Sequence, residues 1–411
     1  MSARRHRLVG AVGAVGAVLA LGAPAPAAQA DWDDLFQPII DAISWVDPGL
    51  AADTDPGSAL SSLDTLFNGW YQDLIYSPLN SIAPWLFGDG LPGSAVAYGP
   101  DSDNLPDSFT VPLEVNLNTQ PVINVSVGGG SQTEVLVDTG AAGLVIPIWN
   151  INPFGITGLP TGFNIGQFGG ALNYFYLELP TTVTFTGENG DTLTADTTVD
   201  AVLFAFPADF SLTGAWSIES YLAGSSTGIL GIGPNALGPT PDHIPTADLP
   251  GNLGNGVLID QPGGRLVFGD NPLEGGTVIQ GAPWTLTNVS DLKVSINGEA
   301  PTSVKAVIDS GGVYGTMPSS VLNAAGVTPI DGKLPNGTEI SVYTKDGTLL
   351  YEYKVDSTLP APTDDATRSP IVVGGNNMNT GNWLFGQQPV YISYTPDGIG
   401  RTIIGGTPIE P

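Results

Sequence analysis

From about Ser108 to the C-terminus, apolar and polar residues alternate in short runs that are separated by Gly, Pro, Asn and Asp. Residues 122–127 alternate, residues 128–130 are glycines, and residues 134–137 alternate again, which is typical of a β-hairpin. The same design recurs over residues 292–296 and 304–308, with Asn297-Gly298 as the turn. The pattern predicts an all-β fold for the larger part of the chain.

Residues 31–107 follow a different pattern, which predicts a helical N-terminal segment and a linker. Apolar residues at three- and four-residue steps between positions 60 and 74 are typical of an amphipathic helix. Apolar residues over 32–43 indicate a second helix, with a kink at Pro38. Gly, Pro, Ser and Asp are frequent in residues 88–106, as in a linker. We expect these helices to pack against the main domain, and docking to a partner or a membrane is the alternative.

The first 30 residues predict a secretory signal peptide. Arginines at positions 4, 5 and 7 precede a short apolar run over residues 8–22. An A-x-A site at residues 28–30 follows, which predicts cleavage after Ala30. A membrane anchor is the alternative, but the run is short and rich in Gly for a membrane span. We therefore expect a protein that is secreted from a bacterial cell or held in the cell envelope.

The composition argues against several kinds of partner and of chemistry. The 411 residues include 40 acidic and 11 basic side chains, and the net charge of −29 argues against binding to nucleic acid or to an anionic membrane surface. The absence of Cys excludes disulfides, thiol nucleophiles and Cys-built zinc sites. With two His in the chain and no EF-hand spacing around Asp101–Asp103, we expect no metal and no cofactor.

An internal repeat divides the β-rich part of the chain into two lobes. Each hairpin described above runs into a closely similar tripeptide, and two apolar residues and a Gly follow tens of residues later. We expect an N-terminal lobe over residues 108–281 and a C-terminal lobe over residues 282–411. The tripeptides are Asp138-Thr139-Gly140 and Asp309-Ser310-Gly311, and the later elements are Ile229-Leu230-Gly231 and Leu384-Phe385-Gly386.

Asp138 and Asp309 are the candidate catalytic residues. One such tripeptide alone is a weak signal, because Asp and Thr also cap turns, but the paired context favours a site. Two carboxyl groups held together cannot both ionise cheaply, so the pair shares a proton. The ionised partner can deprotonate a water while the protonated one donates to a carbonyl oxygen, and together they hydrolyse an amide. The supporting residues are Thr139 and Ser310, which can hydrogen-bond across the lobe junction, and Gly140 and Gly311, which permit close approach of the backbone.

The two tripeptides, with Val137 and Ile308 before them, resemble the active-site signatures of pepsin-like aspartic proteases. The segment over residues 263–269 is similar to the strand that closes the first lobe in that family, so the resemblance covers about Ser108 to the C-terminus. It implies a bilobal all-β fold, an aspartic endopeptidase activity, and a cleft that binds a peptide or protein substrate as an extended strand. Within the family, the Ala-, Gly- and Pro-rich acidic style resembles the mycobacterial PE cleavage protein A group. Members of that group are secreted proteases that trim the PE domains of type VII-exported proteins.

Three features depart from the pattern of that family. A signal peptide stands where members of the group carry their own PE domain, which puts a PE-domain substrate in question. Ala141 and Gly312 follow the tripeptides where pepsin-like enzymes usually carry a hydroxyl, so we expect neither aspartate to receive a hydrogen bond from a side chain at that position. Tyr174 and Tyr176 are candidates for the flap tyrosine, although buried strand aromatics fit the same pattern.

Two other functions stay open. Residues 224–228 match G-x-S-x-G, which makes Ser226 a candidate esterase nucleophile, but an apolar run follows instead of a helix and His243 lies in a Pro-rich loop. A catalytically silent bilobal protein that binds peptides is the second alternative, and the presence of two repelling acids weighs against it. We expect a monomeric aspartic endopeptidase that processes exported or cell-surface proteins.

Overall fold

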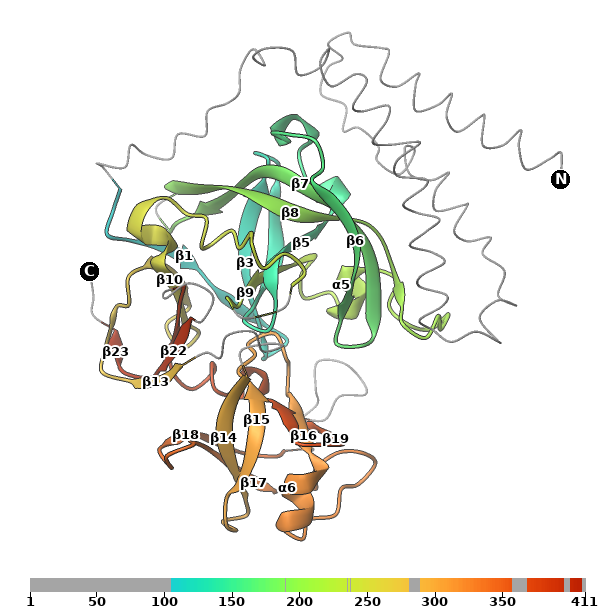
Figure 1. Cartoon of the computed structure of the whole chain (residues 1–411), viewed down its shortest axis with the longest axis vertical. Helices are drawn as coiled ribbons and strands as arrows, with labels where there is room; N and C mark the ends of the chain where they lie inside the picture. The colour runs from blue at the N-terminus through green and yellow to red at the C-terminus, as the bar shows by residue number, and fades with distance from the viewer. Residues whose placement is uncertain are drawn as a thin grey trace, which may run out of the picture.

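The computed structural model describes residues 105–408 except for 189, 235, 237, 281–288, 357–367 and 395–399. The predicted signal peptide and the predicted N-terminal helices lie outside the described residues. Figure 1 shows two β-rich lobes with a third group of strands beside them. The predicted all-β bilobal fold is confirmed. Among the described residues, no helix is long and apolar enough to cross a membrane.

The first lobe is built on an eight-stranded sheet that curls on itself, because β3 pairs with β7 as well as with its neighbours in the sheet order. The strand order is β2-β3-β4-β9-β5-β8-β7-β6. The strands are β2 (Glu114–Asn116), β3 (Gln120–Val127), β4 (Gln132–Asp138), β5 (Ala142–Pro147), β6 (Gly162–Phe168), β7 (Leu172–Thr186), β8 (Thr192–Pro207) and β9 (Gly228–Ile232). The short helices of this part are η4 (Ile148–Asn150), η5 (Pro153–Gly155), α5 (Ile218–Tyr221) and η6 (Gly251–Asn255).

The second lobe is built on a seven-stranded sheet with the order β18-β17-β14-β15-β20-β16-β19. Its strands are β14 (Val289–Ile296), β15 (Thr302–Val307), β16 (Thr316–Pro318), β17 (Glu339–Thr344), β18 (Leu349–Lys354), β19 (Ile371–Val373) and β20 (Asn377–Asn379). The helices are α6 (Ser319–Ala324) and η7 (Gly381–Trp383). Buried apolar residues from both lobes form one continuous core.

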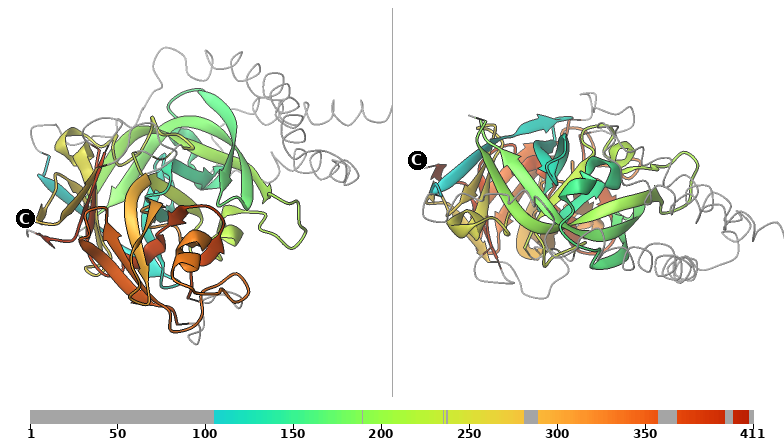
Figure 2. Two further views of the ribbon diagram at one scale, coloured as in Figure 1. Left: turned by 60° about the horizontal axis from the view of Figure 1, so that its bottom comes forward. Right: turned by 90° about the horizontal axis from the view of Figure 1, so that it is seen from above.

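A six-stranded sheet takes strands from both halves of the sequence, in the order β1-β11-β10-β21-β22-β13. Figure 2 shows these strands on one side of the molecule, where blue, yellow and red segments lie together. They are β1 (Ser108–Pro112), β10 (Gly256–Asp260), β11 (Arg265–Gly269), β13 (Thr277–Gln280), β21 (Val390–Ser393) and β22 (Arg401–Ile404). β12 (Leu273–Glu274) and β23 (Thr407–Pro408) form a separate pair.

The burial pattern of β4 explains how this strand carries a carboxylate into the interior. Gln132 and Glu134 are exposed, as strict alternation requires, but residues 135–137 are all buried. A strand that is covered on both faces reads as a continuous apolar run, and here β4 lies between β3 and β9 in the sheet. Asp138 is therefore the first polar residue after a buried run, at the end of an interior strand.

The two lobes repeat the same parallel pairing. In the first lobe, β4 lies parallel to β9, with Asp138 opposite Gly231. In the second lobe, β15 lies parallel to β20, with Val307 opposite Asn379, and the Thr380 N–H donates to the Val307 carbonyl. Continuing this register by two residues places Gly381 opposite Asp309.

The prediction that Leu384-Phe385-Gly386 is the second apolar-apolar-Gly element is therefore wrong. Those residues follow η7, and Leu384 and Phe385 are buried in the core. The segment in the corresponding place is Asn379-Thr380-Gly381, which has polar residues at both apolar positions. A pattern of two apolar residues and a Gly is not specific in a chain that contains 55 Gly.

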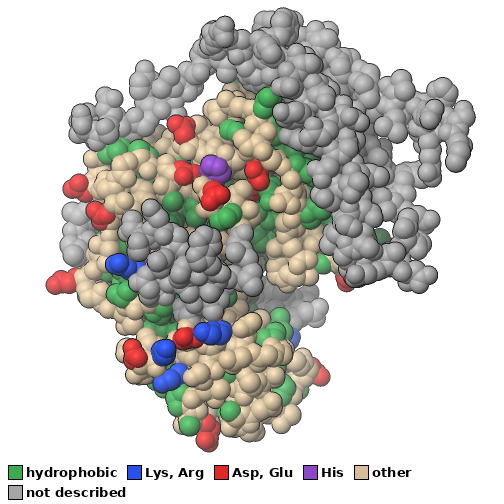
Figure 3. Space-filling view, viewed as in Figure 1, with side chains coloured by type: hydrophobic (Ala, Val, Ile, Leu, Met, Phe, Trp, Pro, Cys, Tyr) green, Lys and Arg blue, Asp and Glu red, His purple; other side chains and the backbone are tan. Residues whose placement is uncertain are grey.

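Basic residues are concentrated in the second half of the molecule. Beyond residue 7, the first Lys or Arg along the chain is Arg265, and its guanidinium pairs with Asp260 at 2.9 Å. On the face in Figure 3, most Lys and Arg side chains accordingly gather over the lower lobe. The first lobe consequently has an acidic surface.

Candidate active site

The two tripeptides meet at the junction of the lobes and exchange four hydrogen bonds. Thr139 Oγ1 donates to the Ile308 carbonyl at 2.7 Å and accepts from the Ser310 N–H at 2.9 Å. Ser310 Oγ donates to the Val137 carbonyl at 2.7 Å and accepts from the Thr139 N–H at 3.1 Å. Thr139 and Ser310 are both fully buried. Each hydroxyl thus ties its own loop to the strand end of the opposite lobe.

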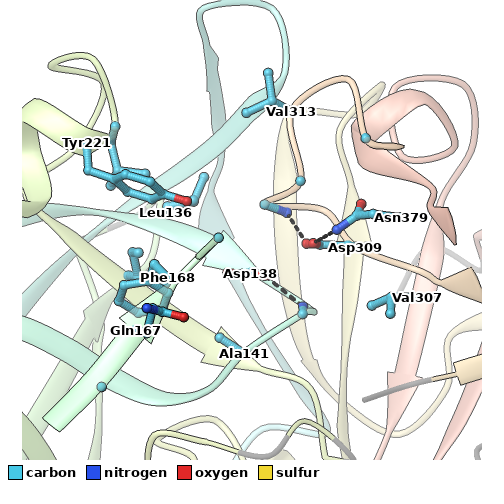
Figure 4. Close-up of a pocket in the computed structure, with 18 of the residues that line it drawn as sticks. Leu136, Asp138, Ala141, Gln167, Phe168, Tyr221, Val307, Asp309, Val313 and Asn379 are labelled. Carbon is cyan, nitrogen blue, oxygen red and sulfur yellow. Dashed lines mark hydrogen bonds between the residues drawn. The ribbon is translucent and has the colours of Figure 1, made fainter. Parts of the chain in front are cut away.

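Gly140 and Gly311 allow the two carboxyl groups to approach across this junction. A Cβ on Gly140 would lie 2.8 Å from Asp309 Cγ, and a Cβ on Gly311 would lie 2.6 Å from Asp138 Cγ. Each carboxylate also accepts from its own tripeptide, from the Gly140 N–H at 2.7 Å and from the Gly311 N–H at 2.9 Å (Figure 4). Any side chain at either glycine would push the opposite carboxyl group away.

Burial raises the pKa of the Asp138 carboxyl well above its ordinary range. The negative charge of Asp309 and a hydrogen bond between the two side chains raise this pKa further, while the N–H groups of Gly140 and Ala141 lower it. A buried pair of acids loses its second proton reluctantly, because two like charges in a site of low polarity repel strongly. The surroundings of Asp138 therefore favour its protonated form.

A cleft of about 900 Å³ lies over the two carboxyl groups, and residues of both lobes line it. The first lobe contributes residues 164–169 of the β6–β7 hairpin, and the second lobe contributes residues 311–316. The hairpin turns at Gly169 and Gly170, which both have the positive φ angles that favour Gly. A hairpin over a carboxyl pair leaves a channel that can hold a peptide in an extended conformation.

Tyr174 and Tyr176 both lie on β7 and both line the cleft. Their side chains are buried, and the Tyr174 ring stacks on Phe168 with the ring centroids 4.8 Å apart. Burial is the main cause of the raised pKa of each phenol, and the charge of Asp200 adds to it. The structure thus places both tyrosines in the hairpin wall, and the choice of flap tyrosine stays a prediction.

Tyr221 lines the same cleft and was not found by sequence reasoning. It ends α5, a four-residue helix whose N-terminus is capped by Ser217 and Ser220. Its hydroxyl lies 2.3 Å from the place that a Cβ on Gly169 would take, so it supports the tip of the hairpin. Burial raises the pKa of Tyr221 to about 12, with contributions from the charges of Asp138 and Asp309. A helix this short leaves no periodic signal in the sequence.

Asn379 is the second cleft residue that sequence reasoning missed. Its Nδ2 donates to Asp309 Oδ2, and Figure 4 shows it beside that carboxylate. The sequence gives only an indirect indication of this donor: Gly312 lacks the hydroxyl that pepsin-like enzymes usually carry there, so a donor to Asp309 must come from another position. No local pattern in the sequence says that the donor comes from a strand about 70 residues later.

The structure contradicts the esterase interpretation of Ser226. The Ser226 side chain is buried and its Oγ donates to the Gly228 carbonyl at 3.4 Å. The strand β9 follows it, whereas a nucleophile elbow opens a helix. His243 lies elsewhere, in a small pocket with Thr197 and Asp248. Within the described part of the chain, no three His, Asp or Glu side chains are grouped so that they could hold a metal ion.

Comparison with known proteins adds a family assignment to this geometry. A family model for the PE-PGRS C-terminal aspartyl peptidase-like domain matches residues 109–402. The chain is 41% identical over 314 residues to PE cleavage protein A of Mycobacterium tuberculosis H37Rv, and 44% identical over 315 residues to PE cleavage protein A of Mycobacterium marinum. Each match covers 72% of this chain and 52% of the relative. The chain thus spans about half the length of the curated relatives it matches.

Proposed function

The chain belongs to the PE-PGRS C-terminal aspartyl peptidase-like domain family, and we propose that it is an aspartic endopeptidase with Asp138 and Asp309 as its catalytic pair. The proposal rests on the close approach of each carboxyl group to the glycine of the opposite tripeptide. A Cβ on Gly311 would lie 2.6 Å from Asp138 Cγ, and a Cβ on Gly140 would lie 2.8 Å from Asp309 Cγ. A cleft lies directly over this pair. Paired carboxyl groups at the base of a cleft can activate a water against an amide.

The pair would work by exchanging two protons with a water and the substrate. The Asp309 carboxylate takes a proton from the water as the water oxygen bonds to the carbonyl carbon, and Asp138 donates its proton to the carbonyl oxygen. When the tetrahedral intermediate collapses, the C–N bond breaks and the leaving nitrogen takes the proton from Asp309. Asp138 regains a proton from the intermediate, so the pair again holds one proton.

The substrate is a peptide bound as an extended strand between the β6–β7 hairpin and the loop after Asp309. The N-terminal-lobe side of the cleft is largely apolar and aromatic, with Leu136, Phe168 and Tyr221 among its lining residues. Apolar side chains of the substrate would bury surface there, at about 25 cal/mol per Å². We therefore expect cleavage next to apolar residues.

The natural substrates are proteins of the bacterial cell surface or secreted proteins. The relatives are named for the cleavage of PE proteins, and a PE-containing protein is the first substrate to test. The leader over residues 1–30 would direct export, with cleavage near Ala30. The sequence of the N-terminus of the protein recovered from culture medium or cell envelope tests this part, and a chain that retains Met1 would contradict it.

A peptidase assay tests the catalytic proposal. The full chain is incubated with casein at about pH 5, with and without pepstatin, and the fragments are mapped by mass spectrometry. We expect pepstatin-sensitive cleavage, and its loss in Asp138→Asn and in Asp309→Asn, because an amide cannot take part in the proton exchange. Ser226→Ala is the matched control and should cleave like the wild type.

The same assay distinguishes the enzyme from a protein that only binds peptides. Either asparagine variant retaining more than a few per cent of wild-type turnover would contradict the assignment of the catalytic pair. Binding of pepstatin to the wild type without any cleavage would favour the silent binding protein. Circular dichroism and thermal unfolding of the variants show whether the fold is intact, so that loss of activity reports on chemistry.

A further inference from the structure

The two halves of the carboxyl pair receive different hydrogen bonds. Asp138 accepts from the backbone N–H groups of Gly140 and Ala141. Asp309 accepts from the Gly311 N–H on Oδ1 and, on Oδ2, from the side-chain amide of Asn379. Among the described residues, only the second carboxylate thus has a side-chain amide as a donor. The pseudo-twofold symmetry of the tripeptides is broken at this point.

The contacts around Asn379 define which end of its amide faces the carboxylate. Asn379 Oδ1 accepts from the Gly381 N–H at 2.8 Å, so the nitrogen end points to Asp309. The reversed amide would place an oxygen against a carboxylate and an NH₂ against an N–H, which loses both hydrogen bonds. The Asn379 backbone N–H donates to Thr316 Oγ1 at 2.9 Å, which holds β20 against β16. The donor is therefore held in place by the sheet.

Asn379 also fills the space that a side chain at position 312 would need. A Cβ on Gly312 would lie 2.3 Å from Asn379 Oδ1 and 2.9 Å from Asp309 Oδ2. A residue with a hydroxyl at position 312 and an Asn at position 379 cannot both be accommodated without movement. A hydroxyl at 312 would nonetheless lie next to the same carboxylate oxygen. The two positions are thus alternative sources of one hydrogen bond.

We propose that Asn379 is the positioning residue that keeps the ionised carboxylate of the pair on Asp309 and leaves the shared proton on Asp138. This inference rests on the proposed peptidase function. A hydrogen bond to a charged acceptor contributes more than one between neutral groups, because the donor dipole stabilises the charge directly. Asn379 supplies such a bond to Oδ2 of Asp309 and thereby favours ionisation at that residue.

The other groups near the pair are compatible with an ionised Asp309 and a protonated Asp138. Burial and the neighbouring negative charge raise the pKa of Asp138, which favours the proton on that residue. The pKa of Tyr221 is raised to about 12, so this phenol stays neutral over the working range of pH. The titratable side chains that line the cleft with the pair are Tyr174, Tyr176, Tyr221, Tyr314 and Lys333.

The first test is the pH profile of kcat/KM for Asn379→Ala. The loss of one hydrogen bond to a carboxylate should lower kcat by about tenfold to a hundredfold, with a smaller change in KM. The acidic limb should move to higher pH, because the ionised form of Asp309 is less stabilised. Asn377→Ala, an exposed residue of the same strand, is the matched control and should leave the profile unchanged.

The second test is rescue from the other position. Gly312→Ser alone should impair activity, because its side chain collides with Asn379 Oδ1. In the double variant Gly312→Ser/Asn379→Ala the collision is gone and the hydroxyl replaces the amide as donor. We expect the double variant to recover most of kcat and the acidic limb of the wild type. A purely structural role of Asn379 would not predict this recovery.

The outcomes separate the inference from the proposed function. If Asp138→Asn and Asp309→Asn retain activity, the proposed function is wrong. If both are inactive while Asn379→Ala keeps the wild-type acidic limb, or the double variant recovers nothing, only this inference is overturned. If Asn379→Ala does not fold, Asn379→Leu keeps the side-chain volume without a donor, and its acidic limb decides the question.

Discussion

At the scale of single residues, the Thr139 hydroxyl holds the two halves of the site together. It donates to the carbonyl of Ile308 and accepts from the N–H of Ser310, and both partners belong to the opposite lobe. The group is completely buried, so no water can replace it. A buried polar group that loses its partner keeps the full cost of its desolvation.

Thr139→Ala should therefore destabilise the protein and also misalign the carboxyl pair. The variant leaves a buried carbonyl and a buried N–H without this partner, at about 1–3 kcal/mol of unfolding free energy. We expect kcat to fall more than KM rises, because the loops that hold Asp138 and Asp309 lose their alignment. Thr139→Ser keeps the hydroxyl and is the control, and urea unfolding together with steady-state kinetics measures both effects. Equal kinetics for Ala and Ser would contradict this role.

The sequence alone predicts the residues that belong to the internal repeat. Asp138 and Asp309 end equivalent apolar runs and precede nearly identical residues, so a single chain carries the comparison within itself. Tyr221 and Asn379 could not be identified in this way. Each reaches the cleft from a segment that is distant in sequence from the tripeptides and that has no recognisable local motif. Gly312 cannot supply a side-chain donor to Asp309, and the donor comes instead from Asn379 on β20.

At the scale of elements, the β6–β7 hairpin depends on the helix α5 for the position of its tip. Gly169 and Gly170 form the turn, with φ of +54° and +69°. The Tyr221 hydroxyl lies 2.3 Å from a Cβ built on Gly169, whereas a Cβ on Gly170 would meet nothing within 4 Å. The positive φ angles favour Gly at both positions, but only Gly169 lies against Tyr221.

The contrast between these glycines gives a paired test of the hairpin. Both alanine variants have the cost of a positive φ, about 1 kcal/mol, so this cost does not distinguish them. Only Gly169→Ala collides with Tyr221, and we therefore expect it to displace the hairpin tip and to raise KM several-fold more than Gly170→Ala does. Tyr221→Phe removes the colliding hydroxyl and should partly restore the Gly169→Ala variant. Steady-state kinetics on one peptide substrate compares the variants. Identical KM values for the two alanine variants would show that the contact with Tyr221 has no part in substrate binding.

The element that sequence reasoning misplaced shows the limit of pattern matching. The apolar pair at Leu384 and Phe385 fits the expected motif better than Asn379-Thr380-Gly381 does, yet the latter pairs with β15. The pairing of strands is defined by backbone hydrogen bonds, which do not depend on the polarity of the side chains. The polar side chains there both bind Asp309: Asn379 Nδ2 donates to its carboxylate, and Thr380 Oγ1 accepts from its N–H at 3.1 Å.

At the scale of the whole molecule, buried acids determine how stability depends on pH. Burial raises the pKa of Asp138, Asp200 and Asp248. The folded state then binds protons more tightly than the unfolded state, so this part of the stability is present below the unfolded pKa and is lost as pH rises through the folded pKa. Asp291 has a lowered pKa and acts in the opposite direction, but it lies at the surface beside Lys305.

We therefore expect the unfolding temperature to fall between about pH 5 and about pH 7.5. Asp200 on β8 is the clearest contributor outside the candidate active site. Thr240 Oγ1 donates to its Oδ2 at 2.7 Å, and its Oδ1 has no hydrogen-bond partner among the described residues. Asp200→Asn should flatten the dependence, whereas Asp196→Asn, at an exposed position of the same strand, should leave it unchanged. A wild-type protein that becomes more stable towards pH 7.5 would contradict the argument.

The six-stranded sheet also makes the two halves of the chain depend on each other for folding. The strand β10 lies between β11 and β21, and β21 and β22 come from residues 390–404, far along the chain from β10. Without residues 390–404, β10 would have an open edge, and an open edge is prone to pair with another chain. The strand order of this one sheet thus leaves the first lobe incomplete without strands from the far end of the second lobe.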